Sequence, residues 1–211
     1  RPLPSRRIAD PRHALVLGLL MIAASVPLAL MLNYYVATYT VLGAAIYVLV
    51  YTYWLKRRSS LNIVVGGLAG SCAAAAGWAT VAPRMNLVSV LVALVVFLWT
   101  PTHFWSFALV HKRSYQHAGV PMMPAVTEDK RSAGYILLYS GITVAASVLL
   151  YFVGHFGALY LAGALLLGGV FVASNVRLLR EPSPARAWSN YKLSGVYLLG
   201  LFLLMFVDTL V

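Results

Sequence analysis

Seven long apolar segments constrain this chain more than any other feature of its sequence. A helix needs about 20 consecutive apolar residues to cross roughly 30 Å of membrane hydrocarbon. The segments that meet this requirement are residues 13–32, 34–55, 61–82, 87–110, 134–153, 158–176 and 193–211. Only 10% of all residues are charged, whereas a soluble domain carries about a quarter. The sequence therefore predicts an all-α polytopic membrane helix bundle that forms a single domain over residues 1–211.

The basic residues alternate in position with these segments. Of the 16 Lys and Arg residues, all but Arg84 fall in four stretches on one side of the predicted membrane: 1–12, 56–58, 111–133 and 177–192. By the positive-inside rule this side is cytoplasmic. We therefore expect a cell-membrane protein with a cytoplasmic N-terminus, an outside C-terminus and a lid-like cytoplasmic loop at 111–133. The formal charge of +11 then reflects topology and anionic ligands, with the lipid bilayer as partner and no nucleic acid.

A cluster of cations and polar side chains lies between the second and third segments. Lys56 and Arg57 stand close to Ser59, Ser60 and Asn62, where the next helix begins. Lys point charges, Arg forks and helix N-terminal amides all bind phosphate oxygens. The cluster predicts a diphosphate site, although basic clusters at a membrane surface also serve as topology signals and lipid contacts. The Asn62 amide fits a ligand contact or a hydrogen bond between helices.

The fourth segment carries an ionisable residue deep within its length. His103 lies nine residues before Lys112, hence roughly 13 Å from the cytoplasmic end of the helix. An ionisable side chain at that depth is a candidate functional residue, and the alternative is a neutral histidine that bonds between helices. The aromatic rings of Trp99, Phe104 and Trp105 fit packing, and they also fit stabilisation of a cation.

Six motifs, in family order along essentially the whole chain, resemble those of the protoheme IX farnesyltransferases, or heme O synthases. This family is a branch of the UbiA-type intramembrane prenyltransferases. The histidine motif and the Ala-Gly-Val-Pro-Met-Met-Pro stretch are the more specific to that branch. The motifs are Arg1-Pro-Leu-Pro, the stretch from Tyr51 to Asn62, Asn62-Ile-Val-Val-Gly-Gly, Trp99-x-Pro-x-His-Phe-Trp, Tyr115-x-x-Ala-Gly-x-Pro-Met-Met-Pro and the closing pattern from Tyr197 to Asp208.

The resemblance implies a nine-helix bundle around a cavity, with two helices before Arg1. Farnesyl diphosphate would bind there with Mg²⁺ on two Asp-rich motifs. Loss of diphosphate would leave an allylic cation that alkylates a vinyl group of heme b, and water would add a hydroxyl to give heme O. Heme-pathway membrane proteins would be possible partners. The site implied has His103 as the catalytic residue or a heme ligand, Lys56, Arg57, Asn62, Lys112 and Arg113 at the diphosphate, and Trp99, Phe104, Trp105 and Tyr115 around heme and prenyl chain.

The chain departs from the family pattern at its acidic motifs. The first would precede Arg1, and the second would supply acids where Arg113 and Ser114 stand. No Asp or Glu occurs between Asp10 and Glu128. We therefore name no metal ligand, and we expect residues 1–211 expressed alone to make no heme O without an upstream segment.

Three other functions remain open on the sequence. Another UbiA-type prenyltransferase would take an aromatic or lipid acceptor, and its product would identify it. A transporter would line its path with buried charges, but the predicted spans are almost free of charge apart from Asp208. An inactive membrane scaffold would fit the missing acidic motifs.

Overall fold

The computed structural model describes residues 10–210, in which all regular secondary structure is helical. Arg1-Pro-Leu-Pro, most of the predicted cytoplasmic segment 1–12 and Val211 lie outside the described residues. The elements are α1 (Pro11–Leu32), α2 (Tyr34–Ala45), the π-helical η1 (Ile46–Leu55), α3 (Asn62–Ala79), α4 (Leu87–Val110), α5 (Lys112–His117), α6 (Met123–Val126), α7 (Asp129–Gly154), α8 (Ala158–Arg180) and α9 (Pro184–Asp208).

Within residues 10–210, seven helices are long and apolar enough to cross a membrane, and α2 and η1 together form one of them. The predicted spans and the all-α fold class are thereby confirmed. Two helices begin earlier than the hydropathy pattern indicates, α7 at Asp129 and α9 at Pro184. Both start with polar turns that continue the helix beyond its apolar part. The side chain of Ser183 caps α9 by accepting from the Arg186 amide, as an N-cap residue does.

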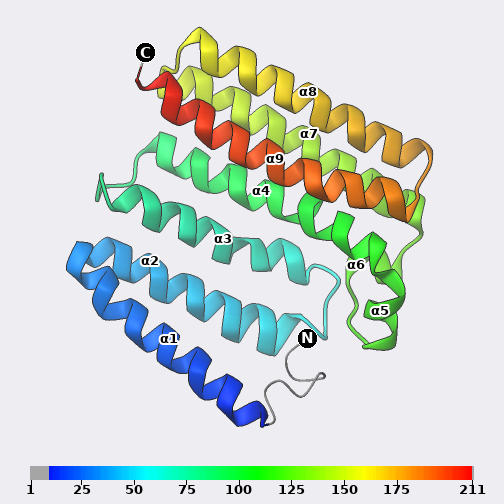
Figure 1. The fold of residues 1–211 in the computed structure, drawn as a ribbon, viewed down its shortest axis with the longest axis horizontal. Helices are drawn as coiled ribbons and strands as arrows, with labels where there is room; N and C mark the ends of the chain where they lie inside the picture. Colours follow the sequence, from blue (N-terminus) through cyan, green and yellow to red (C-terminus); the bar gives the residue numbers. More distant parts are fainter. Residues whose placement is uncertain (1–9, 211) are drawn as a thin grey trace.

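The helices lie side by side, with α4 in the middle of the bundle (Figure 1). On one side α4 contacts α3, which packs on α2, and α1 lies beyond α2. On the other side α4 contacts α7 and α9, and α8 packs against both. Within α1 only Ala29 is buried, and large apolar side chains are exposed along it. Such a surface suits contact with lipid hydrocarbon.

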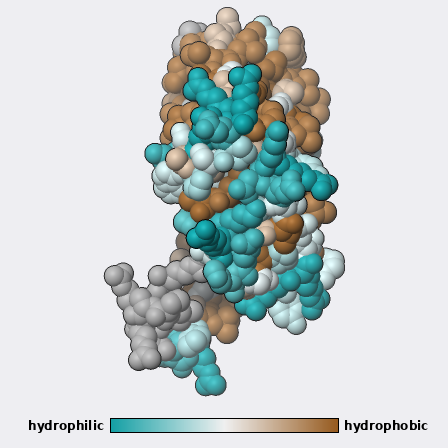
Figure 2. All heavy atoms as spheres, turned by 90° about the vertical axis from the view of Figure 1, so that its right-hand side faces the viewer, coloured by the Kyte–Doolittle hydropathy of each residue, from teal (hydrophilic) through white to brown (hydrophobic). Residues whose placement is uncertain are grey.

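The loops that carry the basic residues meet at one end of the bundle, which we call the basic end. These loops are η1–α3, the segment from α4 to α7, and α8–α9, and they lie on the right of Figure 1. Seen from that side, hydrophilic side chains form an irregular band between apolar flanks (Figure 2). Arg84, in the α3–α4 loop, lies at the opposite end. The segregation of charge is therefore as predicted for the described residues, and the cytoplasmic assignment of the basic end stays a prediction.

Candidate functional site

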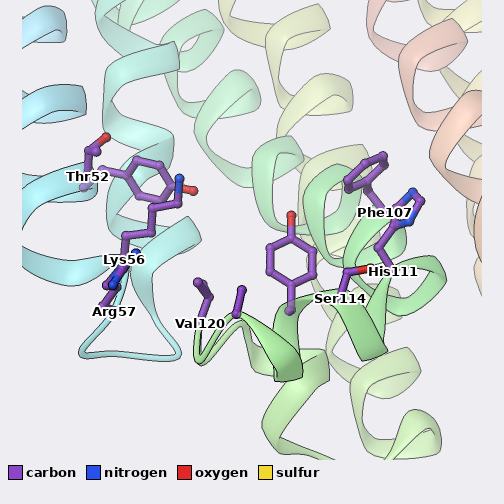
Figure 3. A pocket seen from close by; sticks show the side chains of 10 residues that line it. Thr52, Lys56, Arg57, Phe107, His111, Ser114 and Val120 are labelled. Carbon is purple, nitrogen blue, oxygen red and sulfur yellow. The ribbon is translucent and has the colours of Figure 1, made fainter. Parts of the chain in front are cut away.

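A cavity of about 900 Å³ opens at the basic end between the end of η1 and the start of the α4–α7 segment. Its volume falls in the range of small-molecule sites, roughly 300–1,000 Å³. Figure 3 shows Thr52, Lys56 and Arg57 on one side and Phe107, His111 and Ser114 on the other. The lining residues are Tyr51, Thr52, Lys56, Arg57, Phe107, His111, Ser114, Tyr115, Ala118 and Val120.

Lys56 and Arg57, two of the predicted diphosphate residues, line this cavity. They stand in the turn that follows η1, and Asn62 holds this turn by donating its Nδ2 hydrogen to the Lys56 carbonyl at 3.3 Å. Asn62 is fully buried and does not line the cavity. The structure thus gives Asn62 a hydrogen bond between the turn and α3, while its Oδ1 atom has no partner in the described part of the chain. Two cations and no carboxylate among the lining residues make the cavity attractive to an anion.

The π-helical turns of η1 were not predicted, and they determine how this wall is presented. The Lys56 amide donates to the Tyr51 carbonyl at 2.8 Å, and the Thr52 hydroxyl donates to the Tyr47 carbonyl at 2.7 Å. Both bonds span five residues, the spacing of a π-helix, which is frequent at functional sites. The Tyr51 ring lies so close to α3 that a Cβ on Gly66 would be 2.8 Å from its Cδ2 atom. Glycine at position 66 therefore leaves room for this ring.

The opposite wall is built by the segment between α4 and α7. After α5 the chain turns at Gly119, whose φ of 61° lies in the left-handed region that glycine adopts without steric cost. The Val120 amide donates to the Tyr115 carbonyl at 3.0 Å, and Gln116 Nε2 donates to the Ala125 carbonyl at 3.0 Å. These bonds fold the predicted loop into two short helices against the basic end. Tyr115 lines the cavity, and both its contact with a substrate and a lid motion of the segment stay predictions.

Lys112 and Arg113 were predicted at the diphosphate, but neither lines the cavity. Lys112 Nζ lies 2.6 Å from an Asp129 carboxylate oxygen and also donates to the Thr127 carbonyl at 2.8 Å. Lys112 therefore ties α5 to the start of α7. Arg113 is exposed on α5. Among residues 10–210, only Lys56 and Arg57 bring a positive charge to the cavity lining, and a role for Lys112 or Arg113 in substrate binding stays a prediction.

His103 faces α9 from the middle of α4. Its Nδ1 atom lies 2.7 Å from the Ser194 hydroxyl, and its ring stacks on Trp99 and Tyr191. His103 therefore forms the hydrogen bond between helices that we expected if the residue has a structural role. Phe107, one turn nearer the basic end, contacts Tyr191 with a centroid distance of 5.2 Å and lines the cavity. An aromatic column along α4 therefore leads from the cavity to His103.

The other predicted aromatic residues differ in their surroundings. Trp99 belongs to this column and donates from Nε1 to the Ser194 carbonyl at 2.7 Å. Phe104 is 41% exposed and lines a smaller pocket of about 120 Å³ that shares Tyr51 with the cavity. Trp105 is 2% exposed and belongs to the hydrophobic core near Tyr139. Phe104 can thus meet a ligand that extends from the cavity, whereas Trp105 supports α4 from inside the protein.

Several lining residues were missed by the sequence reasoning, although a signal for two of them existed. Phe107 and His111 follow His103 at intervals of four residues, which places them on one helix face. Ser114 stands where the family motif would have an acid, and only this departure marked it. Thr52 and Val120 lie inside two of the family motifs but were not singled out, because their positions depend on the π-helical turns and on the turn at Gly119.

The residues present do not fit a Mg²⁺ site. In the stretch from residue 10 to 210, no group of three or more His, Cys, Asp or Glu side chains could hold a metal ion. Mg²⁺ takes oxygen ligands, including one or two carboxylates. The residues that line the cavity include two cations and no carboxylate. The metal that the resemblance implies therefore receives no carboxylate from the residues that line the cavity.

Comparison with known proteins supplies the family context of this site. A model of the UbiA prenyltransferase family matches residues 1–206. A protoheme IX farnesyltransferase of Desulforudis audaxviator is 45% identical, and the match covers 99% of this chain and 66% of the relative. A protein of the same name from Symbiobacterium thermophilum is 43% identical, over 99% of this chain and 70% of the relative. The chain thus spans about two thirds of the length of these relatives.

A solved structure supports the fold. It was determined in a study of digeranylgeranylglyceryl phosphate synthase in membranes, and it superposes with a TM-score of 0.76 over 99% of this chain and 73% of that chain. Sequence identity between the two is 20%. At this identity the similarity establishes the arrangement of the helices, and it leaves the substrate of this chain to other evidence.

Proposed function

Because the chain belongs to the UbiA prenyltransferase family, we propose that it transfers a farnesyl group from farnesyl diphosphate to a vinyl group of heme b, giving heme O. The main observation that supports the proposal is the cavity whose lining includes Lys56 and Arg57 together with the aromatic side chains of Tyr51, Phe107 and Tyr115. Curated relatives of 38–45% identity are named protoheme IX farnesyltransferase, which supports heme b as the acceptor. Since the chain spans only part of these relatives, the full activity is a proposal.

In this reaction the bond between farnesyl C1 and the diphosphate oxygen breaks, and its electron pair leaves with the diphosphate. Lys56 and Arg57 would stabilise the developing negative charge, as fixed cations do in a site that excludes water. The terminal carbon of the vinyl group then bonds to farnesyl C1, which leaves a cation next to the porphyrin ring. Water adds to that carbon and loses a proton, so that a hydroxyl group remains.

The residues of the two walls would divide the work. Lys56 and Arg57 bind the diphosphate at the basic end, and Tyr51 and Phe104 border the pocket where the chain of a prenyl substrate can begin. Aromatic faces at this place would stabilise an allylic cation. His103 would act on the acceptor, which we assign to the aromatic column. We derive no step through Mg²⁺, because the described residues offer it no ligand set.

The test is product analysis in cells that lack their own heme O synthase and express this sequence within its complete native reading frame. Heme O in the extracted hemes would support the proposal. No heme O, together with a prenylated aromatic or lipid product, would replace it with another UbiA-type activity. A complete loss of any prenylated product would favour an inactive scaffold.

The diphosphate site has its own test in two single variants. Lys56→Ala and Arg57→Ala should each weaken binding of farnesyl diphosphate at least tenfold, because each removes a cation from the cavity wall. Binding of heme b should change much less. Arg84→Ala, at the opposite end of the bundle, is the matched control for loss of one positive charge. Unchanged affinity for farnesyl diphosphate in both cavity variants would remove these residues from the site.

The basic end would lie at the cytoplasmic surface of the cell membrane, as the positive-inside rule predicts. Single cysteines placed at Arg58 and at Arg84 in a Cys72→Ser background test this orientation. A membrane-impermeant thiol reagent added to intact cells should label position 84 and leave position 58 unlabelled. The reverse pattern would show that the bundle is inverted.

A further inference from the structure

The acidic residues of the chain lie away from the lining of the cavity at the basic end. The sequence has five Asp and Glu residues. Asp10 and Asp208 cap the starts of helices α1 and α8. Two more acids form ion pairs with Lys112 and Arg186. Glu128, the fifth, is exposed at the start of α7 and does not line the cavity. The lining thus offers a divalent cation none of the carboxylates by which Mg²⁺ is usually bound.

The cavity wall from the α4–α7 segment offers hydrogen-bond donors instead. His111 connects α4 to α5, and Ser114 lies three residues later on α5. Both line the cavity, and the ring of His111 packs against that of Phe107 at a centroid distance of 4.3 Å. Within residues 10–210 neither side chain forms a hydrogen bond with another residue. A hydroxyl and an imidazole each have at least one hydrogen to donate, so both groups are available to a ligand.

The opposite wall carries the two cations. Lys56 Nζ lies 5.7 Å from the centroid of the Tyr51 ring, which itself lines the cavity. Arg57 is the next residue in the same turn. Figure 3 shows these cations on one side and His111 and Ser114 on the other. Ionised phosphate oxygens accept hydrogen bonds from charged and neutral donors alike, and the charged ones are stronger. The two walls together therefore suit an anion with several acceptor oxygens.

We infer that the α4–α7 wall binds the diphosphate directly, through the Ser114 hydroxyl and the His111 ring, and that this wall holds no divalent metal of its own. The inference rests on the proposed function in one respect, that the cavity takes a prenyl diphosphate. Ser114 stands where the resemblance expects an acid. A carboxylate there would repel the diphosphate unless a cation bridged the two, whereas a hydroxyl can donate to the same oxygen unaided. Serine at this position thus exchanges a bridged contact for a direct one.

The experiment measures binding of inorganic diphosphate and requires no transfer step. The full chain in nanodiscs of zwitterionic lipid is titrated with diphosphate by calorimetry, once with EDTA and once with Mg²⁺. We expect saturable binding in EDTA. Added Mg²⁺ should leave the affinity unchanged or weaken it, because the ion competes with the wall for the same phosphate oxygens.

Ser114 is tested by three substitutions, which the fold should tolerate because the residue is exposed. Ser114→Asp should weaken binding in EDTA by roughly tenfold or more, through repulsion between like charges, and Mg²⁺ should restore most of this loss. Ser114→Ala should weaken binding about threefold to tenfold in both conditions, as loss of one hydrogen bond does. Ser114→Thr keeps the hydroxyl and should bind normally.

A matched control and a second pair of variants separate this effect from general charge and folding. Ser189 is an exposed serine in α9 near the basic end, outside the cavity lining, and Ser189→Asp should change the affinity by less than about twofold. His111→Gln keeps an N–H donor and should bind nearly as well as the parent chain. His111→Leu should bind several-fold more weakly. Thermal unfolding of each variant verifies that it is folded.

The outcomes distinguish the inference from the proposed function. Diphosphate binding that appears only with Mg²⁺ would overturn the inference, and so would a Ser114→Asp variant that behaves like Ser189→Asp. If the complete reading frame makes heme O nonetheless, the proposed transfer stands without the inference. Metal-independent binding that depends on Ser114, in a protein whose complete reading frame makes no heme O, would sustain the inference and contradict the transfer. Absence of binding in both conditions would overturn the inference together with the diphosphate site.

Discussion

The close approach of Tyr51 to α3 gives a sharp test of how the cavity wall is built. In Gly66→Ala the new Cβ would lie 2.8 Å from Tyr51 Cδ2, 3.2 Å from Cγ and 3.4 Å from Cε2. Ordinary carbon contacts are about 3.5–4.0 Å, so the ring must move by about 0.7 Å. Overpacking of this kind costs roughly 1–3 kcal/mol, and the helix gains about 1 kcal/mol from replacement of glycine by alanine.

We therefore expect Gly66→Ala to lower the free energy of unfolding by about 0–2 kcal/mol, which corresponds to a few degrees in melting temperature. It should also weaken binding of inorganic diphosphate, because Tyr51 lines the cavity beside Lys56. Gly77→Ala is the matched control on the same helix, since its new Cβ meets nothing within 4 Å. This control should be neutral or slightly stabilising.

A double-mutant cycle with Tyr51→Ala isolates the cause. If the Tyr51 ring is what the new methyl group meets, the cost of Gly66→Ala should disappear in the Tyr51→Ala background, with a coupling of about 1–3 kcal/mol. Thermal unfolding of the four proteins in detergent measures this coupling. An equal effect of Gly66→Ala in both backgrounds would refute the geometry that we describe for η1 and α3.

Two further predictions concern contacts away from the cavity wall. Asn190 Nδ2 donates to Ser106 Oγ at 2.9 Å and to Asn175 Oδ1 at 2.8 Å, and all three side chains are buried. Asn190→Ala should therefore lower the free energy of unfolding by about 1–3 kcal/mol. An unchanged melting temperature would contradict this. Lys112→Ala removes a partly exposed ion pair with Asp129 and should change stability by at most about 1 kcal/mol. If Lys112 stays away from the diphosphate in the working enzyme, this variant should bind farnesyl diphosphate with nearly unchanged affinity.

The membrane-spanning helices could be predicted because each depends only on local composition. Length and apolar content identified all seven, and the alternation of basic residues predicted which loops share one end. The boundaries of α7 and α9 were less accessible, because their first turns are polar and lie outside the apolar stretch, and α9 is also capped there by Ser183. Hydropathy reports where a helix meets hydrocarbon, and capping determines where it begins.

The candidate site was predictable only where its residues are adjacent in sequence. Lys56 and Arg57 stand together in one turn, so their common location followed from the sequence alone. Lys112 was assigned to the same site. However, the turn at Gly119 brings Asp129, 17 residues later, beside Lys112, and the two side chains form an ion pair. The Tyr51 ring likewise meets Gly66 across two helices. Pairings of this kind cannot be read from one segment at a time.

The contact between α4 and α9 links the buried polar groups to the proposed chemistry. Asn190 and Ser194 lie one turn apart on α9 and contact Ser106 and His103, which lie about one turn apart on α4. In hydrocarbon a buried amide or hydroxyl without a partner costs several kcal/mol. Sliding α9 by one turn, about 5.4 Å, would break both contacts together. The Asn190 bond therefore holds the register in which Ser194 meets His103, so the position of the His103 ring depends on the packing of two helices and not on α4 alone.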